Sequence, residues 1–287
     1  MRNYEPGPLF TRNSGLVKVS NILPAIKVGN ASYCYLFYQC TNLSTIFDVL
    51  PAKIIGADSY NCMFNSCTSL TVAPYIACEN TGNGNGPFHS MFAGCTSLTH
   101  MNSGILNVQA SFTSHAYMFQ NCTSLTAAPD LNIKSIASHT HLPYMFNGCT
   151  ALSTPPKFLN CVEKNLDCGN MFRNCTSLTA TPPGLEDLYP NWNGTNGGFK
   201  QMFEGCTNLV KGPDYLITKG AYMSAMFKGC SKLTKAPELR NITNESLRES
   251  NGMKEMFRGC SSLSSITVWF TDWNNETATQ NWVSGVA

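Results

Sequence analysis

Charged residues are scarce in this sequence. Asp, Glu, Lys and Arg make up 13% of the 287 residues, and the formal net charge is +2. No run of like charge occurs, so the sequence predicts neither a nucleic-acid-binding surface nor an acidic tail. The exposed positions of the folded chain are therefore expected to carry mostly Ser, Thr, Asn and Gly.

Long apolar runs are also missing. No stretch approaches the roughly 18 consecutive apolar residues that a membrane-spanning helix requires. The first residues, Met1 to Pro8, lack the apolar segment of a secretory signal. We therefore expect no membrane span. Export would need a signal outside this sequence or another route.

Motifs of catalysis and metal binding are absent as well. The sequence contains no G-x-S-x-G, P-loop or HExxH motif, and no C-x-x-C pair of the kind found in zinc sites. Histidines that could activate a thiol nucleophile stand in no distinctive context, and we predict them at the surface or rim: His89, His100, His115, His139 and His141. The sequence thus predicts no enzyme, no cofactor and no metal site.

Cysteines, in contrast, are plentiful and regularly spaced. Nine of the fourteen follow one another at intervals of 27, 28, 27, 27, 26, 31, 24 and 30 residues: Cys40, Cys67, Cys95, Cys122, Cys149, Cys175, Cys206, Cys230 and Cys260. One cysteine per period indicates a repeat position rather than a disulfide framework. A buried column of reduced thiols is favoured, with disulfides or metal ligation as the alternatives. The remaining five share no common place in the period: Cys34, Cys62, Cys78, Cys161 and Cys168.

A repeated motif surrounds each periodic cysteine. The unit reads M-F-x-G/N-C-T-S-L-T-x-A-P-x-L, as in Met63–Leu70 and Met91–Leu98. It recurs from Met118, Met145, Met171, Met202, Met226 and Met256, after an earlier copy at Leu36 and a first, degenerate one with Asn13 in the cysteine position. About ten copies of 24 to 31 residues predict a solenoid, in which each unit completes the core of its neighbour.

Positions within the unit are numbered from its cysteine. Apolar residues at −7, −4 and −3 form the stripe of one helical face, and Gly or Asn at −1 is typical of the left-handed residue that ends a helix. Leu at +3 and a small residue at +6 predict a short buried strand, which Pro at +7 closes. The expected fold is an α/β repeat solenoid, a leucine-rich-repeat-like right-handed array of about ten short strand plus short helix units.

Positions +5 and +8 vary among copies, and insertions follow the strand at residues 79–87, 186–198 and 240–252. Such loops often carry binding surface. The predicted solenoid spans residues 1–266. Residues 267–287 break the pattern with Trp269, Phe270, Trp273 and Trp282, and they are expected to form a C-terminal cap or to begin a further module.

The motif M-F-x-G/N-C-T-S-L-T-x-A-P resembles the BspA-like leucine-rich-repeat proteins of gut Bacteroides, related anaerobes and some of their phages. The resemblance extends from about Leu9 to Trp282. It implies a curved solenoid, an extracellular, cell-surface or virion location, and adhesion or partner binding. It implies no catalytic residue.

The predicted function is binding rather than catalysis. Four charged residues of two adjacent copies are expected to lie side by side: Lys211, Asp214, Lys235 and Glu238. The insertion at residues 186–198, which precedes these two copies, adds Tyr189 and Trp192, residue types that are enriched at binding hot spots. The section Leu185 to Leu239 is thus the predicted contact surface for a protein or glycan on a host or neighbouring cell. The alternative is a structural spacer that displays neighbouring domains. A contiguous patch of variable positions would favour binding, and scattered positions would favour a spacer.

Overall fold

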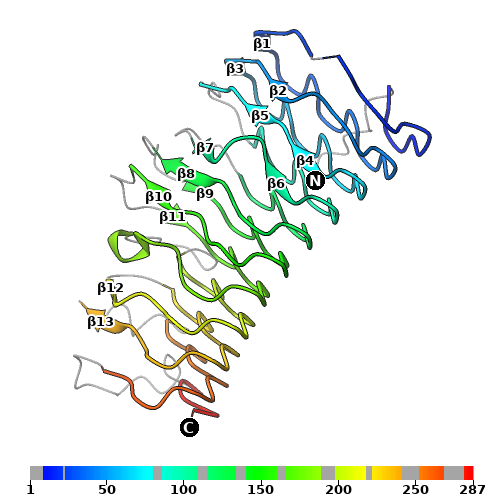
Figure 1. Ribbon diagram of the computed structural model, residues 1–287. Helices are drawn as coiled ribbons and strands as arrows, with labels where there is room; N and C mark the ends of the chain where they lie inside the picture. The colour runs from blue at the N-terminus through cyan, green and yellow to red at the C-terminus, as the bar shows by residue number, and fades with distance from the viewer. Residues whose placement is uncertain are drawn as a thin grey trace.

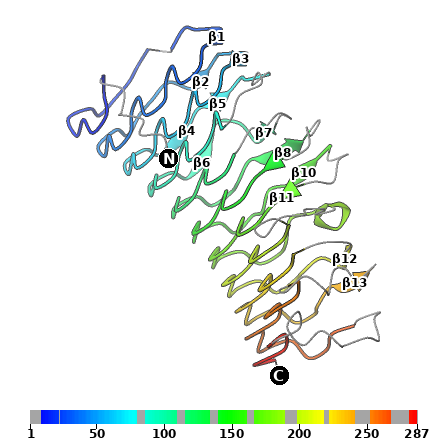
Figure 2. The same ribbon diagram turned by 180° about the vertical axis from the view of Figure 1, so that it is seen from behind.

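The computed structural model of the protein is one elongated array of parallel coils, with the first and the last described coils at opposite ends (Figures 1 and 2). It describes residues 9–21, 23–79, 86–108, 115–133, 140–160, 166–188, 198–217, 222–240, 252–267 and 281–286. Each coil is one sequence repeat. Within the described ranges, no helix is long and apolar enough to cross a membrane.

The strands are short and all pair in parallel between neighbouring coils. They are β1 (Lys27–Val28), β2 (Val49–Leu50), β3 (Ile54–Ile55), β4 (Val72–Ala73), β5 (Tyr75–Ile76), β6 (His100–Met101), β7 (Ile105–Val108), β8 (Asp130–Ile133), β9 (Thr140–His141), β10 (Phe158–Leu159), β11 (Leu166–Asp167), β12 (Tyr215–Ile217) and β13 (Glu238–Arg240). The sheets are β1-β3, β2-β5, β4-β6, β7-β8-β10, β9-β11 and β12-β13. The parallel solenoid expected from the repeats is thus observed.

The predicted short helix is wrong. The described residues contain no α-helix, and their one helical element is the 3₁₀ turn η1 (Leu185–Asp187). The segment before each periodic cysteine, which we call the turn segment, is instead a run of tight turns. The expected unit of strand plus helix, repeated about ten times, is therefore not supported in that form.

Backbone hydrogen bonds explain the turn segment. In the coil ending at Cys40, the N–H of Leu36 donates to the carbonyl of Tyr33 within the coil, at 3.2 Å. The N–H of Phe37 donates to Met63 of the next coil, at 2.9 Å. Amides alternate between these two directions, whereas an α-helix directs them all inside itself.

Left-handed backbone at positions −5 and −1 makes this alternation possible. Tyr35 and Gln39 have φ of 58° and 57°, and Gly94 at −1 has φ of 74°. Gly or Asn at −1 therefore does mark a left-handed residue, as the sequence predicts, but not a helix end. Because the turns repeat every four residues, −7 and −3 both face inward and mimic the helical period of 3.6 residues.

Side-chain columns fill the interior of the array. Met at −4, the periodic cysteine and Leu at +3 are buried in coil after coil. At −3 the phenylalanine rings stack with centroids 5.3 to 5.7 Å apart, in the order Phe10, Phe37, Phe64, Phe92, Phe119, Phe146, Phe172, Phe203, Phe227 and Phe257. One repeated residue type thus becomes one continuous column of the core.

Two further features extend this register. The side-chain amides of Asn107 in β7, Asn132 in β8 and Asn160, which follows β10, form a ladder with both hydrogen bonds at 2.8 Å. At the C-terminal end, Trp282 is buried and its ring lies 6.0 Å from that of Phe257. Trp269, Phe270 and Trp273 lie outside the described residues. The proposed boundary at residue 267 stays a prediction.

Candidate interaction surface

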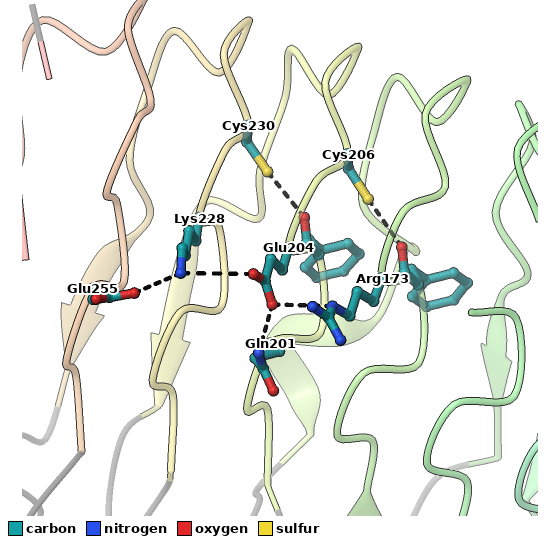
Figure 3. Close-up of polar contacts among 9 residues, drawn as sticks. Arg173, Gln201, Glu204, Cys206, Lys228, Cys230 and Glu255 are labelled. Atoms are coloured by element: carbon teal, nitrogen blue, oxygen red, sulfur yellow. Dashed lines mark hydrogen bonds and ion pairs between the residues drawn. The ribbon is translucent and has the colours of Figure 1, made fainter. Parts of the chain in front are cut away.

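The periodic cysteines form a column of buried, hydrogen-bonded thiols. The thiol of each donates to the carbonyl of the phenylalanine in the preceding coil, at 2.8 to 3.1 Å. Figure 3 shows this contact for Cys206 and Cys230. Burial raises the pKa of the Cys95, Cys149 and Cys206 thiols to about 12. A thiol held protonated in this way is a poor nucleophile and a poor metal ligand.

Thiol reactivity tests this column. Every cysteine among the described residues is a free thiol. We expect the folded protein at pH 8 to react slowly with iodoacetamide, because burial and the raised pKa suppress the thiolate. After unfolding in urea without reductant, most of the fourteen cysteines should react. Finding five or more disulfide bridges by mass spectrometry would contradict the column.

The variable position +5 forms a line along the array in which most residues are exposed, while Val72 and Ala180 are half-buried. Parallel bridges join Lys18 to Thr45 and Ala127 to Thr154, and the bridges of Lys211 join it to both Ala180 and Lys235. In β4 and β6, Val72 pairs with His100 in the same way. The variable +5 residues of these bridged coils therefore lie side by side on the folded chain. We call this line the +5 column.

The structure brings four of the predicted binding residues together. Lys211 and Lys235 are exposed neighbours in the +5 column. Asp214 is exposed, and its carbonyl accepts the N–H of Glu238 at 3.0 Å. The two acids therefore lie on adjacent coils, as the two lysines do. Tyr189 and Trp192, the aromatic candidates, lie outside the described residues.

A further contact at this surface involves Arg240, which no repeat position singles out. Arg240 donates to Glu238 at 2.7 Å, and its guanidinium lies 4.2 Å from the ring centre of Tyr215. The pairing of β12 with β13 places Tyr215 opposite Glu238. A cation over an aromatic ring and a carboxylate beside it stabilise one arrangement of this strand pair. Glu238 is thus engaged by Arg240, and no described ion pair joins it to the lysines.

A second charged group lies on the turn segments (Figure 3). Glu204 contacts Arg173 at 3.1 Å and Lys228 at 3.8 Å, and Gln201 donates to it at 2.6 Å. Lys228 also reaches Glu255 at 2.6 Å, and Arg258 pairs with the same carboxylate at 2.8 Å. At −2 the sign alternates from Arg173 to Glu204 to Lys228, and the following coil brings Glu255 at −5 and Arg258 at −2. The variation at +5 and +8 gives no sign of this network, because its residues occupy −2 and −5.

Removing the central carboxylate should weaken the array. Glu204→Gln is expected to lower the free energy of unfolding by about 1 kcal/mol, because its partly buried carboxylate has three partners. The matched control is Glu79→Gln, which breaks an ion pair with Lys53 whose side chains are 49% and 66% exposed. We expect almost no effect there. If urea denaturation shows the same loss in free energy of unfolding for both variants, the network around Glu204 stabilises the array no more than an exposed ion pair does.

The same network predicts a dependence on acid. The hydrogen bond from Lys228 lowers the pKa of Glu255 below its ordinary value of 4.5. The stabilisation by this group is therefore complete above that value and is lost as pH falls through the lowered pKa. Melting temperatures of wild type and Glu255→Gln measured between pH 7 and pH 3 should converge as the pH falls.

The expectation that the histidines lie at the surface or rim is wrong for His115. Its side chain is fully buried, and the ring lies tilted against Phe88 in the column at −7, with centroids 4.9 Å apart. His89 is half-buried beside Tyr117, and His100 is exposed. An imidazole can replace an aromatic ring in such a column because its flat shape is similar. Among the described residues, no group of three or more His, Cys, Asp or Glu side chains is placed to hold a metal ion.

Solved structures similar to this chain include leucine-rich-repeat proteins. One from Bacteroides ovatus is 17% identical, with 90% of this chain and 73% of that chain covered and a TM-score of 0.29. One from T. pallidum is 19% identical, covering 76% and 78%, with a TM-score of 0.37. A leucine-rich cell surface protein from Faecalibacterium prausnitzii is 15% identical, covering 91% and 90%, with a TM-score of 0.26. No curated protein matches the sequence.

A family model gives the broadest sequence match. It aligns three times in overlapping positions, to residues 58–183, 88–212 and 167–284, which together span most of the chain. The finer resemblance to BspA-like surface proteins stays a prediction. The chain belongs to the family described as Mycoplasma protein of unknown function, DUF285.

Proposed function

We propose that this protein is a non-catalytic binding module whose contact surface lies on the +5 column and the neighbouring loops, within the section Leu185 to Leu239. The contiguity of the +5 column supports this proposal. A spacer needs no such line, since its exposed residues have only to remain soluble. The expected partner is a protein or glycan on a host or neighbouring cell, met on a bacterial surface or a virion.

The division between constant and variable columns supports the same reading. The columns at −4, −3, 0 and +3 repeat the same residue types and are buried, so they are unavailable to a partner. Differences between coils appear at exposed positions such as His100, Thr154, Lys211 and Lys235. A partner that recognises one section of the array must therefore contact these positions.

A triple variant tests the location of the surface. Trp192, Lys211 and Lys235 are replaced together by alanine, and binding is measured on immobilised panels of glycans and extracellular-matrix proteins. We expect the binding seen with wild type to disappear, while the melting temperature falls by no more than a few degrees, because exposed side chains contribute little to stability.

Two outcomes would oppose the proposal. Unchanged binding by the folded triple variant would move the surface elsewhere, most directly to the Trp-rich C-terminal residues. If wild type binds nothing on either panel, the spacer alternative is favoured over a binding module.

A further inference from the structure

We propose that Lys211 and Lys235 form a recognition site for the acidic groups of an anionic polysaccharide. The inference deepens the proposed function and rests on it, because it names the chemical class of the ligand for the same surface. The fold places the two positively charged side chains on neighbouring coils, side by side.

The lysine pair is held in register by the backbone. Lys211 and Lys235 are direct partners in a parallel bridge, so their Cα atoms are separated by about the strand spacing of 4.8 Å. Like charges placed opposite one another on a sheet are destabilising. Among the described residues, neither ammonium group forms an ion pair, and an anionic group held between the two would relieve the repulsion.

Charge in the coils that carry and follow the lysine pair has the same sign, whereas the preceding coil, residues 166–188, carries one basic and three acidic side chains. The described residues between 198 and 267 carry eight basic and four acidic side chains, whereas those between 9 and 160 carry five and four. Of the four acids, Glu204, Glu238 and Glu255 are engaged by basic neighbours. The excess of positive charge therefore lies in this part of the array and attracts anionic partners.

Hydroxyl groups beside the lysines indicate the rest of the ligand. Thr234 donates to the carbonyl of Val210 at 3.4 Å, and Ser231 donates to that of Thr207 at 3.4 Å. Both donors lie within four residues of Lys235, and Thr234 is exposed. With their hydrogens directed at the backbone, these hydroxyls offer lone pairs outward.

A partner for this surface needs anionic groups for the lysines and many O–H donors for the hydroxyl oxygens. An acidic polysaccharide supplies both on one chain. An acidic peptide offers few hydroxyl donors, and the phosphate backbone of DNA offers none. The repetition of the coils also suits a polymer that presents the same groups at regular intervals.

Binding to defined polymers tests the proposal by calorimetry. The probes are polygalacturonate, dextran sulfate, neutral dextran and duplex DNA. We expect wild type to bind a carboxylated or sulfated polysaccharide, with the two acidic probes showing which anion is preferred. Neutral dextran and DNA should bind more weakly. Binding should weaken as salt is raised, because these charges are exposed.

Matched variants separate this site from net charge. Lys211→Ala with Lys235→Ala should weaken binding about tenfold or more, since two charge-assisted hydrogen bonds are lost. Lys27→Ala with Lys157→Ala removes the same charge from other exposed positions and should bind like wild type. Replacing both site lysines by arginine should retain binding, because the charge remains.

The proposal is overturned if neither acidic polysaccharide binds, if DNA binds as tightly, or if the control pair loses as much affinity as the site pair. Failure of the proposed function looks different. In that case wild type also binds nothing on the glycan and matrix-protein panels. Binding to neutral glycans or to proteins alone would keep the binding module and reject its anionic ligand.

Discussion

Phe146→Ala is expected to lower the free energy of unfolding by about 3–5 kcal/mol, as large-to-small core substitutions do. Phe146 is fully buried, and its ring stacks on Phe119 and Phe172, at 5.5 Å in each case. Alanine would leave a cavity in the middle of the column and remove two ring contacts. Leu125→Ala, in the fully buried +3 column, should cost about 2–5 kcal/mol for the same reason.

Phe10→Ala provides the matched control in urea denaturation. Phe10 belongs to the same column, but its side chain is 36% exposed and only one ring neighbour is described, Phe37 at 5.5 Å. Less contact is lost there, so the cost should be clearly smaller. If Phe146→Ala unfolds within error of wild type, the assignment of the inward face is wrong.

Gly56→Ala is expected to destabilise the protein by about 1–3 kcal/mol, the cost typical of overpacking. A Cβ at this position would lie 2.7 Å from the backbone nitrogen of Asn30 and 2.8 Å from the carbonyl carbon of Gly29. Both atoms belong to the backbone of the preceding coil, so they cannot move aside as a flexible side chain could. The substitution would have to push two coils apart.

Gly104→Ala is the control for this effect. A Cβ at Gly104 meets no atom within 4 Å, so the same substitution should leave stability nearly unchanged. The comparison cancels the general consequence of replacing glycine, which acts on the unfolded chain. Equal melting temperatures for the two variants would show that Gly56 is not in close contact with the preceding coil.

The sequence was informative wherever a position repeats because the core requires it. Phe at −3 and the periodic cysteine each occupy one place in the coil, and repetition alone identifies them as buried columns. The left-handed residue at −1 was predicted correctly, since Gly94 and Gly148 both have φ of 74°. That Lys211 and Lys235 lie side by side also followed from the sequence, because both occupy position +5 of adjacent copies.

The secondary structure of the turn segment could not be read in the same way. Over seven residues, a run of four-residue turns and an α-helix place nearly the same positions inward, so Tyr60, Met63 and Phe64 fit both. The two structures differ in the acceptors of their backbone N–H groups. In the turn segment, the N–H of Phe64 donates to the carbonyl of Met91 in the next coil, at 2.9 Å. Hydrogen bonds between coils leave no signature in the order of apolar residues.

The contacts around Glu204 and Arg240 were hidden for a different reason. Each depends on side chains that are distant in sequence and that meet only once the register of the coils is fixed, as Arg173 and Lys228 do at Glu204. Comparing position −2 across neighbouring copies would have shown the opposite charges of Arg173, Glu204 and Lys228. The engagement of Arg240 with Tyr215 depends on the pairing of two short strands, which the repeat period does not specify.

Hydrogen–deuterium exchange with and without a bound partner tests the central claim most directly. The account predicts that binding slows exchange in peptides containing Lys211 and Lys235 and leaves peptides of the turn segments, such as those around Glu204 and Lys228, unchanged. Protection confined to the turn segments, with no change at Lys211 and Lys235, would contradict it.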